Sequence, residues 1–327
     1  REIMKKSFKL FLAAAVLVTE FFVVALPLMI TSAKADGHPI QAVTHAGFGG
    51  GTDVTTRMML LRTRRYLKQD MQLVNKKGGG GAASMDYMMT LPADGNHTLT
   101  WTTGHAVSMA LGKTKVKLSD MQPLARGTDD PQLFVVNCKN DIKDAKKFIS
   151  AQKSKSLKYG TTHVGGIDDV SAIAFTKKGK LTDPTIVAYK GVGPIKTNLI
   201  KGDIDVGVLN LGEAVTEIED GTLCVSVVLA SNRMEKLSNV PTATELGIPV
   251  VLSTVRGFVT RKGVPADRKK QLEDAMIKAM EHKYFQSFLT DIGLDSTSVV
   301  GADEWGKQME VMLAEMTAQL KALGYIN

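Results

Sequence analysis

Cysteine and aromatic residues are scarce in this sequence of 327 residues, which has two cysteines and 6% aromatics. Two cysteines are too few for a small disulfide-stapled domain, and a chain of this length can bury a sufficient core without such bonds. No stretch interleaves basic side chains with aromatic ones, so the net charge of +8 does not indicate a nucleic-acid-binding protein. The sequence also lacks the Gly-x-Ser-x-Gly elbow and the His-Glu-x-x-His motif, which argues against a serine hydrolase and a zinc protease.

The first 35 residues differ in composition from the rest of the chain. A lysine-rich start precedes the apolar run Leu10–Ile30, and Ala33-Lys34-Ala35 matches the small-residue pattern of a signal-peptide cleavage site. We therefore expect a signal peptide, cleaved after Ala35, and export of the mature chain. The alternative is an uncleaved anchor, because 21 apolar residues could span a bilayer. Glu20 inside the run disfavours that alternative.

After the N-terminal segment, short apolar runs alternate with helical patterns. Strands are expected near 40–43, 72–75, 98–101, 133–136, 157–159, 186–188, 204–209 and 223–230, most of them followed by a loop and a helix. This alternation predicts an α/β fold. Near the C-terminus, two methionine-rich patterns repeat at helical spacing and are expected to be core-facing helix sides.

The glycine-rich stretch from Val43 to Arg57 is the most informative segment. An apolar run enters it as a buried strand would, and a helical pattern leaves it. Glycine permits positive φ and close approach of the backbone to a ligand. The glycines here are Gly47, Gly49, Gly50 and Gly51. Thr52 and Asp53 follow where a helix cap is expected, so free N–H groups at a positive helix end would suit an anion.

The end of this loop indicates which anion to expect. A phosphate loop ends in Gly-Lys-Ser/Thr, whereas this loop ends in Gly-Thr-Asp, and a dinucleotide loop has glycine or alanine where Thr52 stands. The acidic Asp53 in the first helical turn would also repel a phosphate dianion. A carboxylate is therefore the expected ligand, and a tight turn without any ligand is the alternative.

Several other polar loops are expected at the carboxyl ends of strands, where open α/β sheets bind ligands. Their polar groups are hydroxyls, amides and backbone N–H groups, with Lys190 and Arg256 as the nearby permanent cations. Such a site holds an anion by hydrogen bonds and does not transform it, so no catalytic residue, cofactor or metal is expected. The candidate ligand-binding residues are His45, Gly49, Gly50, Gly51, Thr52, Asp53, Thr103, His105, Thr161, Thr162, Tyr189, Lys190, Gly191 and Asn210.

A series of motifs resembles a known family. The motifs are His45–Arg57, Val74-Asn75-Lys76 with Gly78–Ala82, Pro92-Ala93-Asp94-Gly95, Tyr159-Gly160-Thr161-Thr162, Ala188-Tyr189-Lys190-Gly191 and Asn239-Val240-Pro241-Thr242. Their order and spacing resemble the Bug-type extracytoplasmic solute receptors of tripartite tricarboxylate transporters, over almost the whole chain after residue 35. One departure is the first loop, which reads Thr44-His45-Ala46-Gly47-Phe48 where the family has prolines before the glycines.

The resemblance implies a two-lobed periplasmic binding protein of type II, with a hinged cleft that holds a small carboxylate. Lobe 1 would comprise residues 36–137 and 228–327, and lobe 2 residues 138–227. Ligand contacts would come from Gly49–Asp53, from Thr161 and Thr162, and from Tyr189–Gly191. The implied protein is a periplasmic monomer whose partners are a large and a small integral membrane subunit. Tricarboxylates, dicarboxylates, aromatic acids and amino acids all stay open as ligands.

Three of the six histidines, His45, His105 and His163, fall in strand-end loops. Three imidazoles suffice for a catalytic zinc, so an exported metal-dependent enzyme is one alternative function. Neutral hydrogen-bonding or capping roles are the other interpretation, because no metal-ligand spacing occurs in the sequence. If the histidines face the ligand, protonation below about pH 6.5 should tighten anion binding. A sensor subunit that binds the same ligand is a further alternative.

The two-lobed arrangement leads to an expectation for the cysteines. Two strands should connect the lobes, and Leu133–Val136 and Leu223–Ala230 are the candidates. Cys138 and Cys224 would then lie together at the second-lobe ends of these strands. We hypothesise a disulfide between them, with two separate buried thiols as the alternative.

Overall fold

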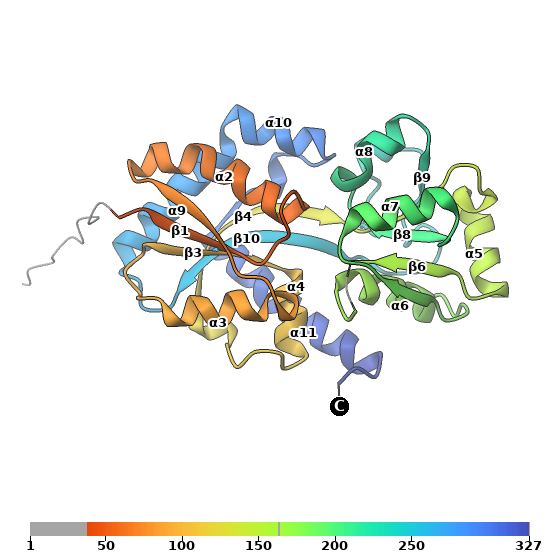
Figure 1. Ribbon diagram of the computed structural model, residues 1–327, viewed down its shortest axis with the longest axis horizontal. Helices are drawn as coiled ribbons and strands as arrows, with labels where there is room; N and C mark the ends of the chain where they lie inside the picture. The colour runs from red at the N-terminus through yellow and green to blue at the C-terminus, as the bar shows by residue number, and fades with distance from the viewer. Residues whose placement is uncertain (1–37, 163, 327) are drawn as a thin grey trace, which may run out of the picture. The chain divides into compact units, whose positions relative to one another are not determined.

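The computed structural model describes residues 38–162 and 164–326, and these form two β-sheets (Figure 1). The predicted signal peptide at residues 1–35 lies outside the described residues. In the described part of the chain, no helix combines the length and the hydropathy that a membrane span requires. The α/β fold class predicted from the strand and helix patterns is confirmed, and the two sheets agree with the two-lobed fold that the resemblance implies.

The first sheet has six strands in the order β11-β4-β10-β3-β1-β2. Its parallel part places β1 between β2 and β3. Strand β10 pairs antiparallel with β3, and β4 pairs antiparallel with β10. The strands are β1 (Ile40–Thr44), β2 (Met71–Asn75), β3 (His97–Thr102), β4 (Met121–Pro131), β10 (Ser253–Arg261) and β11 (Val300–Gly301). The carboxyl ends of β1 and β3 therefore lie at the same edge of this sheet.

The second sheet has five strands in the order β7-β6-β8-β5-β9. Here β6 pairs parallel with β7 and β8, and β5 pairs antiparallel with β8 and β9. The strands are β5 (Leu133–Asn137), β6 (Lys158–Thr161), β7 (Thr185–Ala188), β8 (Val206–Leu209) and β9 (Leu223–Val228). This sheet repeats the plan of the first: parallel strands with loops at their carboxyl ends, and antiparallel strands beside them.

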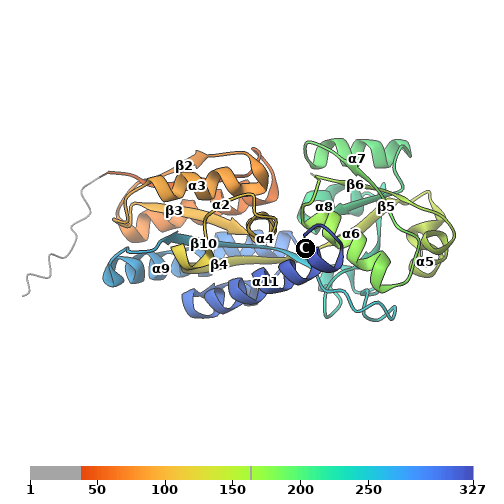
Figure 2. The same ribbon diagram turned by 90° about the horizontal axis from the view of Figure 1, so that it is seen from below.

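Helices cover both faces of each sheet. On the first sheet, α2 (Gly51–Leu67), α9 (Ala266–Glu281) and α10 (Lys283–Asp291) share one apolar core. The opposite face carries α3 (Ala82–Thr90), α4 (Thr103–Ala110) and α11 (Ala302–Ala322). Helix α11 packs along β4 (Figure 2). On the second sheet, α5 (Ala145–Ser154) and α6 (Ile167–Lys178) cover one face, and α7 (Val192–Lys201) and α8 (Leu211–Glu219) the other.

The two methionine-rich helices are core elements, as predicted. In α9 the buried stripe includes Leu272, Met276 and Met280, and in α11 it includes Trp305 and Met309. Methionine suits this position because its unbranched chain fills irregular gaps between helix and sheet.

The predicted inter-lobe strands are not the elements that pass between the sheets. Leu133–Val136 and Leu223–Val228 lie side by side as β5 and β9 within the second sheet. The chain changes sheets at Gln132 and again between Leu229 and Leu252. These three residues are tied together: Gln132 N–H donates to Leu252 O, Leu229 N–H to Gln132 O, and Leu252 N–H to Leu229 O, each at 2.9 Å. The cross-tie lies at the junction between the sheets, before β5 and after β9.

The hypothesised disulfide is confirmed. Cys138, directly after β5, is bonded to Cys224 in β9, across 86 positions of sequence. The bond joins two strands that are already paired, because Val136 faces Cys224 in the ladder. It therefore fastens the antiparallel part of the second sheet at the end away from the cross-tie.

Candidate functional site

A cavity of about 610 Å³ lies where the strand-end loops of the two sheets meet. Loops after β1 and β3 of the first sheet and after β6, β7 and β8 of the second contribute to its lining. Nine of the fourteen predicted ligand-binding residues line it. They are His45, Gly49, Gly50, Gly51, Thr52, Thr162, Lys190, Gly191 and Asn210.

On the first-sheet side, the cavity wall is formed by the starts of two helices. The N-cap of α2 is Gly50, so the N–H groups of residues 51–53 belong to its unpaired first turn. The N-cap of α4 is Thr102, and Gly104 in its first turn also lines the cavity. Both helix ends present partial positive charge to the space between the sheets.

The glycine loop is ordered by a contact that the sequence did not predict. Thr52 and Asp53 are not the helix cap, because α2 begins one residue earlier, at Gly51. Asp53 instead reaches back from the third helical position and accepts the N–H of Gly49, the residue before the N-cap, at 3.0 Å. The Gly49 N–H is therefore used within the loop, and the donors left for a ligand are those of the first helical turn.

On the second-sheet side, three more helix starts reach the cavity. Gly191 is the N-cap of α7, and Asn210 is the N-cap of α8. Ile167 and Asp168 form the start of α6. Five helix N-termini from both sheets thus line a single cavity, and this concentration of helix dipoles favours an anionic group.

Thr162 is committed to a partner in its own loop. Its N–H donates to Asp168 Oδ2 at 2.9 Å, and its hydroxyl donates to the same oxygen at 2.6 Å. The side chain of Asp168 thereby occupies the anion position that the Thr162 N–H would offer. Thr162 lines the cavity, and both its N–H and its hydroxyl are engaged by Asp168.

Arg256 of β10 ties the two sides of the cavity together. Its guanidinium pairs with Asp130 at 3.1 Å and donates to the Asn210 side chain and to the Thr52 hydroxyl, each at 3.2 Å. Asn210 in turn donates to the carbonyl oxygens of Asp130 and Pro131. The guanidinium also fills the space beside Gly51, where a Cβ would lie 2.7 Å from Nη2.

Acidic side chains around Arg256 have raised pKa values. Burial raises the pKa of Asp130 to about 6, although Arg256 opposes the shift. Burial likewise raises the pKa of Glu213 to about 7; the Asn210 N–H and Arg256 lower it, and the charges of Asp168 and Asp130 raise it. Glu213 accepts the Asn210 N–H at 3.0 Å and so closes the capping box of α8.

Five predicted residues do not line the cavity. Asp53 is buried beneath the glycine loop and pairs with Arg57 at 2.9 Å. Thr103 is buried and accepts the Val255 N–H, which ties α4 to β10. The others are Thr161, buried at the end of β6, Tyr189, packed into the core under α7, and His105.

His105 is enclosed behind the loop that precedes α3. Its Nδ1 accepts the Thr102 N–H at 3.0 Å, and its Nε2 lies 3.0 Å from the Ser84 hydroxyl, which donates to Gly81 O. Burial, with a smaller contribution from His45, holds the pKa of His105 well below its usual value. His105 therefore does not meet the condition of the pH expectation, because it does not line the cavity and its pKa is lowered.

The three-histidine zinc hypothesis receives no support from the described residues. His45 and His105 stack edge to face with ring centroids 4.3 Å apart, and both nitrogens of His105 are engaged. His163 lies outside the described residues. Within residues 38–162 and 164–326, no group of three histidine, cysteine or acidic side chains has the geometry to hold a metal ion.

Several lining residues were not among the predicted ones. One of them is Arg256, which the sequence predicts only as a permanent cation near the strand-end loops. Another is Phe48, which is 86% exposed. Its position inside the glycine loop could have predicted that it lines the cavity. Asp168 and Glu213 sit in first helical turns after predicted strand-end loops, and acidic residues there were a second signal.

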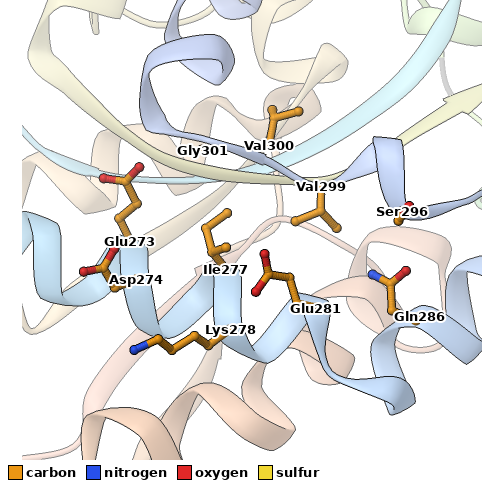
Figure 3. Close-up of a pocket in the computed structure, with 10 residues that line it drawn as sticks. All are labelled: Glu273, Asp274, Ile277, Lys278, Glu281, Gln286, Ser296, Val299, Val300 and Gly301. Carbon is orange, nitrogen blue, oxygen red and sulfur yellow. The ribbon is translucent and has the colours of Figure 1, made fainter.

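Two other hollows lack this convergence of loops. A cavity of about 650 Å³ is lined by Glu273, Asp274, Lys278 and Glu281 of α9 and by Val299–Gly301 (Figure 3). Glu273 accepts the Ala302 N–H there and so begins α11, which is a structural role. Another, of about 760 Å³, lies beside the segment that follows β9. Neither is lined by the glycine loops.

Comparisons with known proteins bear on this site. The sequence model described as "Tripartite tricarboxylate transporter family receptor" matches residues 55–323. A UPF0065 protein of Agrobacterium vitis is 25% identical over 248 residues, which cover 74% of this chain and 71% of the relative. Protein BugT of Bordetella pertussis is 26% identical over 220 residues, which cover 64% of this chain and 66% of BugT.

Solved structures share the fold. MatC from Rhodopseudomonas palustris with bound malate superimposes with a TM-score of 0.77 at 23% identity, covering 86% of this chain and 99% of MatC. An R. palustris protein with adipate gives a TM-score of 0.79 at 21% identity, and the match covers 89% of this chain and 99% of that protein. At these identities the likeness concerns the fold alone.

Proposed function

Because the chain belongs to the tripartite tricarboxylate transporter receptor family, whose members are periplasmic solute-binding receptors and not enzymes, we propose that it delivers a small carboxylate to such a transporter. The partners would be a large and a small integral membrane subunit. The protein would act as a monomer in the periplasm after cleavage behind Ala35. The relatives with malate and adipate support an organic acid as the ligand.

The observation that carries the proposal is the convergence of five helix N-termini on one cavity between the sheets. Each amide or hydroxyl bond to a carboxylate contributes about 1.5–3 kcal/mol. Four such bonds at about 3 kcal/mol each, less an ordering cost of about 4 kcal/mol, leave about 8 kcal/mol, which corresponds to roughly micromolar affinity. That affinity suits capture and release of a solute.

We further propose that each sheet with its helices forms one lobe and that the lobes close on the ligand. The cross-tie at Gln132, Leu229 and Leu252 would be the hinge. The domain limits predicted from the sequence stay a proposal, with one change: β5 pairs within the second sheet and so moves to the second lobe. A sensor role would use the same cavity, and no observation favours it over transport.

A thermal-shift screen against organic acids tests the proposed function. An acid at 100 times its dissociation constant should stabilise the protein by about 2.7 kcal/mol. The carboxamide of the same acid is the matched control, because it keeps the shape and removes the charge that the helix dipoles favour. No shift with any acid, or an equal shift with the amide, would contradict the proposal.

A further inference from the structure

The cavity of about 610 Å³ between the sheets is called the cleft here, and a smaller side cavity lies beside it. The side cavity has a volume of about 310 Å³ and shares Gly49–Gly51, Val192, Gly193, Glu213 and Arg256 with the cleft. Because these residues line both spaces, the two cavities adjoin across the glycine loop. A ligand held at the helix starts of the cleft therefore lies next to the side cavity.

The far wall of the side cavity is nonpolar. Val54 comes from α2, and Phe288 and Ile292 come from α10 and its end, while Val192 of α7 lines both cavities. All four side chains are only half-buried, so they keep uncovered apolar surface. A volume near 300 Å³ is at the lower end of small-ligand sites, and apolar walls with a few polar groups are typical of such sites. The cavity suits one ring or a short alkyl chain.

The charges around the side cavity disfavour a second carboxylate. Its two cations are both paired with acids: Arg256 with Asp130 at 3.1 Å, and Lys196 with Glu217 at 2.7 Å. Asp130 and Glu213 also line this space, and Asp130 Oδ1 is buried without a hydrogen-bond partner among the described residues. A second carboxylate would stand beside two acids and no unpaired cation.

We propose that the ligand is a monocarboxylic acid with a nonpolar body, held by its acid group at the helix starts and by its body against Phe288, Ile292 and Val192. The inference deepens the proposed function and rests on it. It excludes malate-like and citrate-like acids as the preferred ligands of this chain. The burial of each methylene group in the side cavity adds affinity that a shorter acid does not obtain.

Hexanoate and adipate form a matched pair for the test, since they differ only by a terminal carboxylate on a chain of six carbons. Calorimetric titration of the full chain after residue 35 should show hexanoate binding at least tenfold more tightly than adipate. Benzoate and 3-phenylpropanoate should bind about as tightly as hexanoate, and malate and citrate should bind about as weakly as adipate.

Variants of the side-cavity wall locate the effect. Phe288→Ala should weaken hexanoate binding about tenfold and leave adipate binding unchanged. Tyr284→Ala is the matched control, because Tyr284 lies on the same helix, is 49% exposed and does not line the cavity. Val54→Thr, which keeps the shape and adds a hydroxyl at a residue that lines only the side cavity, gives a second measurement should Phe288→Ala fold poorly.

The outcomes separate the two proposals. Tighter binding of adipate, malate or citrate than of hexanoate overturns the monocarboxylate inference and leaves the carboxylate receptor intact. An unchanged ratio of hexanoate to adipate affinity in both Phe288→Ala and Val54→Thr overturns it too. If no acid binds at all, the proposed function fails together with the inference.

Discussion

Arg256 is the side chain that connects most parts of the candidate site. It and Asp130 are each almost fully buried, and its other contacts reach Thr52 in the first sheet's loop and Asn210 in the second's. A buried ion pair contributes little net stability when compared with a nonpolar pair of the same shape. Its value here is geometric, since one guanidinium fixes the glycine loop and the start of α8 relative to β10.

Removal of the guanidinium should destabilise the fold strongly. Arg256→Met leaves Asp130 buried without its cation, and the free energy of unfolding should fall by about 3–5 kcal/mol. The control is Arg233→Met, which breaks an ion pair with Glu245 whose partners are 42% and 45% exposed. The control substitution should lower the free energy of unfolding by less than about 1 kcal/mol. Urea unfolding measures both, and equal losses in the two variants would contradict the account.

Glu213 should give the stability a dependence on pH. Its pKa is raised from 4.5 to about 7 in the folded chain, so between these values the folded state holds more protons than the unfolded state. The associated stability is present below pH 4.5 and is lost as the pH rises to about 7. The groups that face Glu213 are Arg256, Asp168, Asp130 and the Asn210 N–H.

Glu213→Gln removes this titration and keeps an oxygen for the Asn210 N–H. The melting temperature of the variant relative to the unchanged protein should rise from pH 4.5 to about pH 7 and level off above. Asp130, with a pKa of about 6, titrates in both proteins and so cancels in the difference. Because Glu213 is only half-buried, the effect should be modest. A difference that stays constant between pH 4 and pH 8 would refute the assignment.

Among the elements, the pair β5 and β9 is held by both a strand ladder and a disulfide. In the chain-entropy account, a cross-link over 86 positions stabilises by about 4 kcal/mol, because it restricts the unfolded chain. The double variant Cys138→Ser with Cys224→Ser should lose about that much in urea unfolding. A reductant should lower the stability of the unchanged protein to the same value and have no effect on the variant. Equal stability of the reduced and oxidised protein would contradict the expectation.

The strand–loop–helix units were predictable because their local signals agree. β1, β2, β3 and β6–β8 are short apolar runs followed by glycine-rich or threonine-rich loops, and each lies within two residues of its predicted place. The helices α9 and α11 followed from their methionine spacing. The existence of the cavity followed from a general rule, that loops at the carboxyl ends of parallel strands lie together.

The two long antiparallel strands were not predictable from local pattern. β4 reads Met-Gln-Pro-Leu-Ala-Arg-Gly-Thr-Asp-Asp-Pro, which is poor in strand-forming residues and contains two prolines. It becomes a strand because β10 and β11 pair with it from elsewhere in the sequence. β10 contains Gly257, where a Cβ would lie 2.3 Å from the Trp305 ring, so this glycine reflects packing against α11.

The details of the site depended on the same long-range packing. Arg256 lies on β10, far in sequence from the loops it connects, so its central role had no local signal. His105 and Thr103 sit at predicted strand ends but turn inward, His105 to cap α4 and Thr103 to bind β10. A single sequence gives the loop to which a residue belongs and does not give the direction of its side chain.

For the molecule as a whole, the proposed hinge makes a prediction about size. Since the cavity is lined from both sheets, a ligand that contacts both sides should draw the lobes together. Small-angle scattering of the chain after residue 35 should show a smaller radius of gyration with a saturating acid than without it. The matched carboxamide should cause no change. An unchanged radius with the bound acid would contradict closure and leave binding itself untouched.

The central claim is that backbone amides at helix starts of both sheets hold one carboxylate. Hydrogen–deuterium exchange measures these amides directly, with and without a bound acid. The account predicts slower exchange at residues 51–53 of α2 and at residues 192–193 of α7 in the same experiment. Protection at only one of these helix starts, or at neither, while the acid is bound would contradict it.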